Sequence, residues 1–222
     1  HTYMGVYEIR DRDEAVSIMV DKANIAADTI KNNYDCCVAY YDEHLLEISI
    51  EQRRLLGEFE PALQNDEFVM YLQPQVKRDG AAKGAEALVR WVHPSRGILT
   101  PYAFIDILEN AGLIYKLDLY IWEKAAQKLA EWKEKGYGSY HISVNISTKD
   151  FYIIDIYETF TGLINKYGIA ASNLHLEITE TTLMTDFEKN MNIIHKLQGV
   201  GFRVAVSYTH LRAHETKANL VC

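Results

Sequence analysis

Three apolar segments of the sequence each carry polar side chains that could take part in chemistry. Residues 86–91 read Glu-Ala-Leu-Val-Arg-Trp, residues 141–147 include Asn145, and residues 174–180 include Glu177. Carboxylate and amide oxygens are hard ligands, which suit Mg²⁺, Mn²⁺ or Ca²⁺ better than Zn²⁺. Two such ions polarise a phosphoryl oxygen and activate a water molecule for in-line attack. The residue types therefore indicate an oxygen-ligand metal site that acts on a phosphate ester.

The first of these segments places an acid and a base on one face of a strand. Side chains alternate between the two faces of a strand, so Glu86, Leu88 and Arg90 point the same way. A buried charge needs a partner or a metal ion. Two interpretations follow: Glu86 and Arg90 form an internal salt bridge, or they contact a metal ion and a ligand. Taken singly, Glu177 is typical of a surface acid at a strand end, and Asn145 of a turn or cap residue.

Apolar periodicity and turn signals predict the elements that position these residues. Phe68–Val76 and the segment around Glu86 flank an Asp79-Gly80 turn signal, which predicts an antiparallel hairpin. Further strands are expected at 141–146, 174–178 and 202–206. Helices are expected over about 100–112, 115–136, 148–167 and 185–199. Strands separated by single helices form a parallel sheet or barrel, whose active site lies at the carboxyl ends of its strands. We therefore expect an α/β barrel with one reversed strand.

Two caps are predicted within these helices. Thr100 and Pro101 stand as N-cap and first residue of one helix. Thr185 and Glu188 form a capping box at the start of another. Upstream, residues 1 to about 56 indicate a strand, a helix and a second strand, and a charge-rich connecting helix is expected from His44 to Leu63.

Composition narrows the classes of function. The chain has 222 residues, of which 48% are hydrophobic, so it can form a core. Its formal net charge of -8 argues against a nucleic-acid partner, because binding to nucleic acid depends on Lys and Arg. Three cysteines form no disulfide framework, which fits a reducing compartment. The sequence has no apolar run of about 20 residues, so a cytoplasmic location is expected.

Several motifs together resemble the EAL-domain cyclic di-GMP phosphodiesterases. The motifs, in chain order, are Leu72-Gln73-Pro74, Glu86-Ala87-Leu88, His93-Pro94, Phe104-Ile105, Ser143-Val144-Asn145-Ile146-Ser147 and Leu176-Glu177-Ile178-Thr179-Glu180. The resemblance implies a TIM-like (β/α) barrel whose first strand is antiparallel. It also implies a metal-dependent hydrolysis of cyclic di-GMP to linear pGpG, with Mg²⁺ or Mn²⁺ as cofactor. The usual Tyr-Gln-Pro is Leu72-Gln73-Pro74 here, which keeps the glutamine.

The same resemblance implies roles for six residues. Glu86, Asn145 and Glu177 would be the metal ligands and the catalytic set. Gln73, Leu88 and Arg90 would bind the substrate, with Gln73 and Arg90 on its phosphates. A homodimer formed through the EAL domain is compatible with the family, as is a sensor or membrane domain upstream.

The resemblance divides the chain into four parts. Residues 1–47 are similar to the C-terminal part of a GGDEF domain, an α+β unit, and residues 48–56 are a linker helix. Residues 57–206 correspond to a partial EAL domain, with the barrel truncated after about its fifth strand. Residues 207–222 depart from the family and resemble a translated sequencing-adapter read-through.

The departure at the end bears on activity. In the family, an Asp-Asp pair and later Lys and Glu residues complete the metal site. The sequence after Val206 contains no Asp and does not continue the family pattern. We therefore expect the parent protein to be a phosphodiesterase and these 222 residues to be inactive. The alternative is a catalytically silent cyclic di-GMP receptor or a regulatory domain, in which the dinucleotide is held without turnover.

Overall fold

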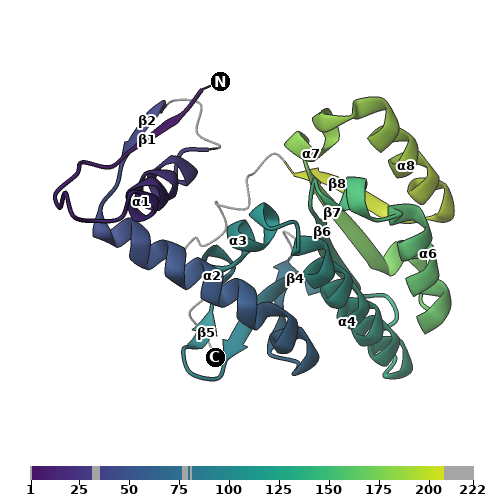
Figure 1. Cartoon of the computed structure of the whole chain (residues 1–222). Helices are drawn as coiled ribbons and strands as arrows, with labels where there is room; N and C mark the ends of the chain where they lie inside the picture. Colours follow the sequence, from purple (N-terminus) through teal and green to yellow (C-terminus); the bar gives the residue numbers. More distant parts are fainter. Residues whose placement is uncertain (1, 32–35, 77–79, 81, 208–222) are drawn as a thin grey trace. The chain divides into compact units, whose positions relative to one another are not determined.

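The first unit of the chain is a small strand-helix-strand element. The structure is a computed structural model that describes residues 2–31, 36–76, 80 and 82–207, and it divides the chain into His1–Glu60 and Pro61–Cys222. In the first unit, β1 (Met4–Val6) pairs in parallel with β2 (Val38–Tyr40), and α1 (Val16–Asp28) connects them (Figure 1). This confirms the predicted order of strand, helix and strand.

Helix α2 (Glu43–Gln64) carries the chain from the first unit into the second, as the predicted connecting helix does. Among the residues that the structure describes, no helix has the length and apolar character needed to cross a membrane. The predicted turn at Asp79 and the segment 208–222 lie outside the described residues.

Gly5 allows β1 to pack closely on α1. A Cβ atom at Gly5 would overlap the backbone carbonyl of Ala23 and lie 2.6 Å from the backbone nitrogen of Ala27. Backbone atoms of a helix cannot rotate away, so the strand itself would have to move. We expect Gly5→Ala to destabilise the first unit by about 2–3 kcal/mol, towards the upper end of ordinary overpacking costs.

Amide hydrogen exchange can measure this loss within α1. Tryptophan fluorescence supplies the control, because all three tryptophans, Trp91, Trp122 and Trp132, belong to the second unit. Exchange in α1 that is as slow in Gly5→Ala as in the native chain would contradict the close packing.

The second unit is built on one mixed sheet with the order β3-β4-β6-β7-β8. Its strands are β3 (Phe68–Val76), β4 (Ala82–His93), β6 (His141–Ile146), β7 (Leu174–Thr179) and β8 (Arg203–Ser207), with the short β5 (Gly97–Leu99) paired to β4. β3 is antiparallel to β4, whereas β4, β6, β7 and β8 run parallel. The predicted hairpin and the reversed first strand are therefore confirmed. Over the described residues, β3 and β8 form the two edges of this sheet.

The helices of the second unit differ in detail from the prediction. They are η1 (Pro101–Ala103), α3 (Ile105–Asn110), α4 (Ile114–Glu134), α5 (Asp150–Ile153), α6 (Ile156–Tyr167), η2 (Ala171–Asn173), α7 (Glu180–Thr185) and α8 (Phe187–Val200). The prediction of a single helix over 100–112 is wrong, because Phe104 leaves the helical conformation and separates η1 from α3. Thr100 precedes this helix but its side chain makes no capping bond.

Two further boundaries are set by aspartate caps. The helix expected over 148–167 divides because Ile154 is extended and the carboxylate of Asp155 accepts from the backbone of Glu158 at 3.0 Å. The prediction of a capping box at Thr185 is also wrong, because the cap lies one residue later. Asp186 is the cap of α8 and accepts from the backbone of Lys189, and Thr185 ends the unpredicted helix α7.

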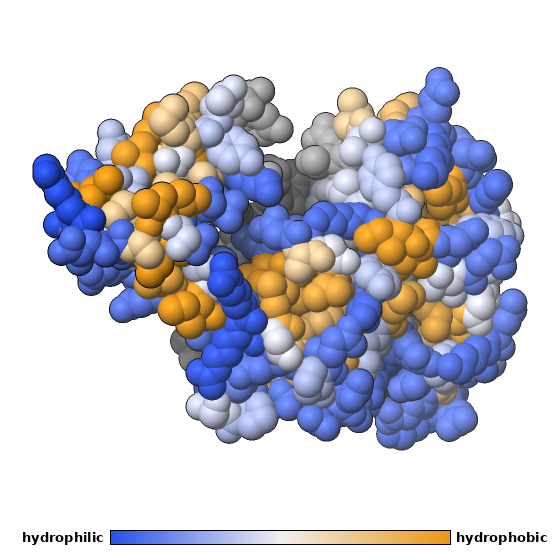
Figure 2. Space-filling model, in the orientation of Figure 1, coloured by the Kyte–Doolittle hydropathy of each residue, from blue (hydrophilic) through white to orange (hydrophobic). Residues whose placement is uncertain are grey.

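The core lies between one face of the sheet and the helical layer. Ile142, Val144 and Ile146 of β6 alternate with polar residues and are almost fully buried, as are Leu174, Leu176 and Ile178 of β7. Helix α4 contacts β6 and α6, and α6 contacts α8 (Figure 1). The outer surface of this helical layer is largely hydrophilic (Figure 2). The opposite face of the sheet carries the polar residues of β3, β4, β6 and β7.

Candidate functional site

The predicted site residues Gln73, Glu86, Asn145 and Glu177 lie in a row across one face of the sheet, which we call the polar row. In the antiparallel pair, Gln73 is opposite Glu86, and in the next pair Glu86 is beside Ser143. Further across, Asn145 is beside Glu177. Residues that are directly paired, or two positions apart, share a face of a sheet. The sheet therefore brings the predicted metal ligands to the same face of three consecutive strands.

Two of the three predicted ligands are in direct contact. The Nδ2 of Asn145 donates to Oε1 of Glu86 at 3.2 Å. Glu177 is the register partner of Asn145, and all three side chains are partly buried. A rotation of the Asn145 amide by 180° would exchange its nitrogen and oxygen, and would place an oxygen beside the carboxylate. The row thus offers hard oxygen donors of the kind that a divalent cation takes.

Carboxylates alone do not build this site. Among the residues with described placement, no group of three or more His, Cys, Asp or Glu side chains is arranged to hold a metal ion. The candidate oxygen donors that the three predicted ligands bring to this face are therefore two carboxylates, of Glu86 and Glu177, and the amide of Asn145.

The guanidinium of Arg90 contacts its own strand and the neighbouring strand β3. Its Nη1 donates to the carbonyl of Val89 at 2.9 Å, and its guanidinium carbon lies 5.8 Å from the centre of the Tyr71 ring. The salt-bridge interpretation of these two residues is therefore not supported by the contacts of the guanidinium. Gln73 and Leu88 are partly exposed on the same face as Arg90, so the three predicted substrate-binding side chains are accessible together.

Sequence reasoning missed a glutamine that links three strands. The Nε2 of Gln75 donates to Oε1 of Glu177 and to Oγ of Ser143, both at 3.3 Å. Its Oε1 lies 3.0 Å from Nε2 of His141. The signal was present, because Gln75 follows Gln73 by two residues and so shares its face of β3.

His141, which contacts this glutamine, stacks on a second histidine, His175. The rings of His141 and His175 are stacked, with their centres 3.8 Å apart and an angle of 12° between their planes. Burial lowers the pKa of His175 to about 4, and the charge of His141 acts in the same direction. His175 is therefore neutral at pH 7, which favours stacking over charge repulsion.

Behind the site, two acids lie next to each other: Asp118 in α4 is partly buried, and Asp150 in α5 follows the loop after Asn145. Asp150 is fully buried, and its Oδ2 accepts from the backbone of Ser147 at 2.7 Å, whereas its Oδ1 has no hydrogen-bond partner among the described residues. Burial raises the pKa of Asp118 well above its usual range, and the adjacent Asp150 raises it further. Burial also raises the pKa of Asp150. These two acids are therefore protonated more readily in the folded chain than in the unfolded chain.

We expect Asp118→Asn to stabilise the second unit at pH 8 and to have little effect near pH 3. A carboxyl whose pKa is raised on folding favours the native state only while it is protonated, so its contribution falls as the pH rises through the folded pKa. Asparagine stays neutral, and its amide can donate a hydrogen bond to the adjacent carboxylate of Asp150. Urea unfolding followed by tryptophan fluorescence at the two pH values measures the difference. A variant that is less stable than the native chain at pH 8 would contradict the proposed origin of the raised pKa.

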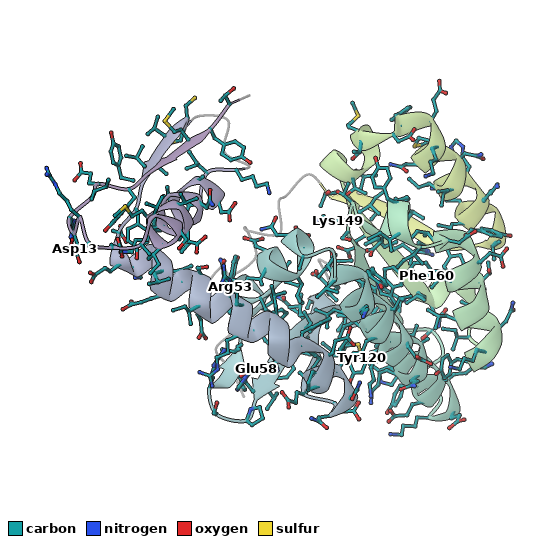
Figure 3. All side chains as sticks on the ribbon, in the orientation of Figure 1. Asp13, Arg53, Glu58, Tyr120, Lys149 and Phe160 are labelled. Carbon is teal, nitrogen blue, oxygen red and sulfur yellow. The ribbon has the colours of Figure 1, made fainter. Side chains whose placement is uncertain are left out.

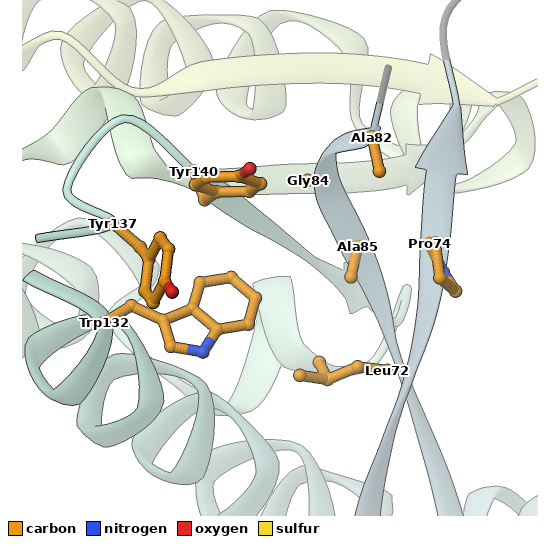
Figure 4. Close-up of a pocket in the computed structure, with 8 residues that line it drawn as sticks. All are labelled: Leu72, Pro74, Ala82, Gly84, Ala85, Trp132, Tyr137 and Tyr140. Carbon is orange, nitrogen blue, oxygen red and sulfur yellow. The ribbon is translucent and has the colours of Figure 1, made fainter. Parts of the chain in front are cut away.

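A separate apolar pocket lies on the other face of the hairpin. It has a volume of about 300 Å³ and is lined by Leu72, Pro74, Ala82, Gly84, Ala85, Trp132, Tyr137 and Tyr140. The three aromatic rings gather opposite Leu72 and Ala85 (Figure 4). Leu72 and Ala85 alternate with Gln73 and Glu86 along their strands, so this pocket does not belong to the polar row.

The sheet has a reversed first strand and carries carboxylate and amide side chains in a row on one face. The family comparison identifies the class of protein to which this arrangement belongs. The chain belongs to the EAL domain family, whose model matches residues 57–212. The bifunctional diguanylate cyclase/cyclic di-GMP phosphodiesterase MucR of Pseudomonas aeruginosa is 28% identical over 182 residues, which are 82% of this chain and 26% of MucR. The cyclic di-GMP phosphodiesterase PdeR of Escherichia coli is 29% identical over 143 residues, 64% of this chain and 22% of PdeR.

Solved structures agree with this assignment. A MucR phosphodiesterase in complex with c-di-GMP matches with a TM-score of 0.66 at 29% identity, covering 69% of this chain and 62% of that one. The resemblance predicted from the motifs is thereby confirmed. The chain spans less than a third of the length of its curated relatives MucR and PdeR.

Proposed function

We propose that the polar row of the second unit is the metal and phosphate side of a cyclic di-GMP phosphodiesterase site. In this proposal Glu86, Asn145 and Glu177 hold Mg²⁺ or Mn²⁺, and Gln73, Leu88 and Arg90 bind cyclic di-GMP. The observation that carries the proposal is the contact between Asn145 and Glu86, with Glu177 in register beside them. Relatives named as cyclic di-GMP phosphodiesterases support the choice of substrate.

The three substrate-binding residues have complementary tasks. Arg90 presents a planar guanidinium, which suits a phosphate better than the point charge of a lysine does. The amide of Gln73 can donate to a second phosphate oxygen. Leu88 lies between Glu86 and Arg90 on the same face, where its apolar side chain reduces the access of water. Together they would hold the phosphodiester against the metal ligands.

The reaction proposed for the site is the hydrolysis of one phosphodiester bond, which converts cyclic di-GMP into linear pGpG. When bound, the divalent ion would polarise a phosphoryl oxygen and lower the pKa of a water ligand. Glu86 and Glu177 supply the negative charge that holds such an ion, and Asn145 adds a neutral ligand. The sequence contains no adjacent pair of aspartates, so we expect these 222 residues to bind the dinucleotide without turning it over.

Calorimetry and product analysis on the whole chain test the proposal. We expect Mn²⁺ to bind, cyclic di-GMP to bind more tightly when Mn²⁺ is present, and no pGpG to be released. Metal-dependent release of pGpG would show that the expectation of inactivity is wrong. Binding of cyclic di-GMP that is insensitive to Mn²⁺ and EDTA would favour the receptor. A chain that binds neither Mn²⁺ nor cyclic di-GMP would overturn the proposed site.

A further inference from the structure

We propose that Gln75 is a positioning residue that holds Glu177. Its side chain reaches across β4 over Gly84, where no side chain stands in the way. This inference deepens the proposed function and rests on it, because it assigns the support of one proposed metal ligand. Gln75 lies on β3, whereas Glu177 lies on β7, and β4 and β6 separate the two strands. Few side chains could span that width.

Gly84 makes this reach possible. It is the register partner of Gln75 in the antiparallel pair and of His141 in the parallel pair. A Cβ atom at Gly84 would overlap the imidazole ring of His141. Because Gly84 has no side chain, the ring of His141 and the amide of Gln75 can meet over β4.

The contacts of Gln75 fix the orientation of its amide. Its Nε2 donates to Oε1 of Glu177 at 3.3 Å, so the nitrogen of the amide faces Glu177. The oxygen then faces His141, which must carry its proton on Nε2 in order to donate at 3.0 Å. Ser143, which is only 2% exposed, also contacts this amide, because its Oγ accepts a hydrogen bond from Nε2 of Gln75.

His141 is itself held in place. Its ring stacks on His175, and Nε2 of His175 lies 3.1 Å from the carbonyl of Ser172 in η2, just before β7. The amide of Gln75 is therefore anchored on the side away from Glu177. An anchored donor fixes the rotamer of the carboxylate, as a hydrogen-bonded outer partner does for a metal ligand.

Gln75→Met tests this role, because methionine keeps the length of the side chain and removes the amide. Gln127→Met is the matched control, since the amide of Gln127 donates to the hydroxyl of Tyr167 at 3.1 Å, away from the polar row. In the metal-free chain, the ¹³C resonance of the Glu177 carboxyl, assigned with Glu177→Gln, is expected to move in Gln75→Met alone. The affinity for Mn²⁺ is expected to fall by about 10–100-fold, the usual cost of losing an outer partner.

A second variant tests the anchor. His141→Ala keeps the glutamine but removes the group that fixes its oxygen, and we expect a smaller change of the same resonance in the same direction. A Glu177 resonance that is unchanged in Gln75→Met would overturn the inference whether or not metal binds. Equal Mn²⁺ affinities for the native chain and Gln75→Met would also overturn it. If the native chain binds no Mn²⁺, the proposed function fails, and the resonance still decides whether Gln75 holds Glu177.

Discussion

Glu86→Gln is expected to lower the affinity of the chain for Mn²⁺ by more than about 100-fold, beyond the loss that an outer partner of a metal ligand causes. The substitution preserves the shape of the side chain and its contact with Asn145, but it removes one of the two negative charges of the polar row. A neutral amide oxygen is a much poorer partner for a doubly charged ion than a carboxylate is. Titration with Mn²⁺, followed by electron paramagnetic resonance of the free ion, measures the change.

Glu134→Gln provides the control for this loss of charge. Glu134 is exposed at the end of α4, so its replacement changes the net charge equally without touching the polar row. Tryptophan fluorescence should show that both variants unfold at the same urea concentration. If Glu86→Gln and Glu134→Gln bind Mn²⁺ equally well, Glu86 is not a metal ligand, and the proposed site has to be placed elsewhere.

The common face of the site residues could be predicted because period-two alternation is a local property. β3 begins and ends where its apolar pattern and turn signal predict, at Phe68 and Val76. Once β6 and β7 are parallel neighbours with their apolar residues on the core side, Asn145 and Glu177 share the other face. The positions of the proposed ligands therefore follow from short-range pattern together with strand order.

The support of Glu177 could not be predicted in the same way. The contact with Gln75 spans 102 residues and depends on the lateral distance between strands that are not neighbours. Gly84 is indistinguishable in the sequence from a glycine that merely weakens a strand. Its role becomes visible only when the ring of His141 occupies the space beside it.

The predicted helix boundaries were wrong for a different reason, which is that adjacent residues compete to be the N-cap. Thr185 and Asp186 are both good N-cap residues, and each has a helix starting or ending beside it. The sequence cannot decide between them, because the choice depends on how α7 closes against β7. At Asp155 the same preference interrupts a continuous apolar pattern and divides it into α5 and α6.

Trp122→Ala is expected to cost the second unit about 3–5 kcal/mol of its free energy of unfolding, the usual range for the loss of a buried tryptophan. Trp122 is 1% exposed, and its ring lies 4.6 Å from that of Phe160, which α6 contributes to the core (Figure 3). Its Nε1 also donates to the backbone carbonyl of Asn145 at 3.0 Å. The alanine variant therefore opens a cavity between α4 and the sheet and releases the end of β6.

Trp122→Phe separates these two effects. Phenylalanine retains the packing against Phe160 but removes the indole hydrogen bond to the carbonyl of Asn145, which costs about 1–3 kcal/mol if the group stays buried and unsatisfied. Urea unfolding can be followed by the remaining Trp91 and Trp132 in both variants. If the alanine variant is no less stable than the phenylalanine variant, α4 does not pack on β6 as described. A loss of Mn²⁺ affinity in Trp122→Phe, in a chain that is still folded, would show that the helical layer positions Asn145 through its backbone.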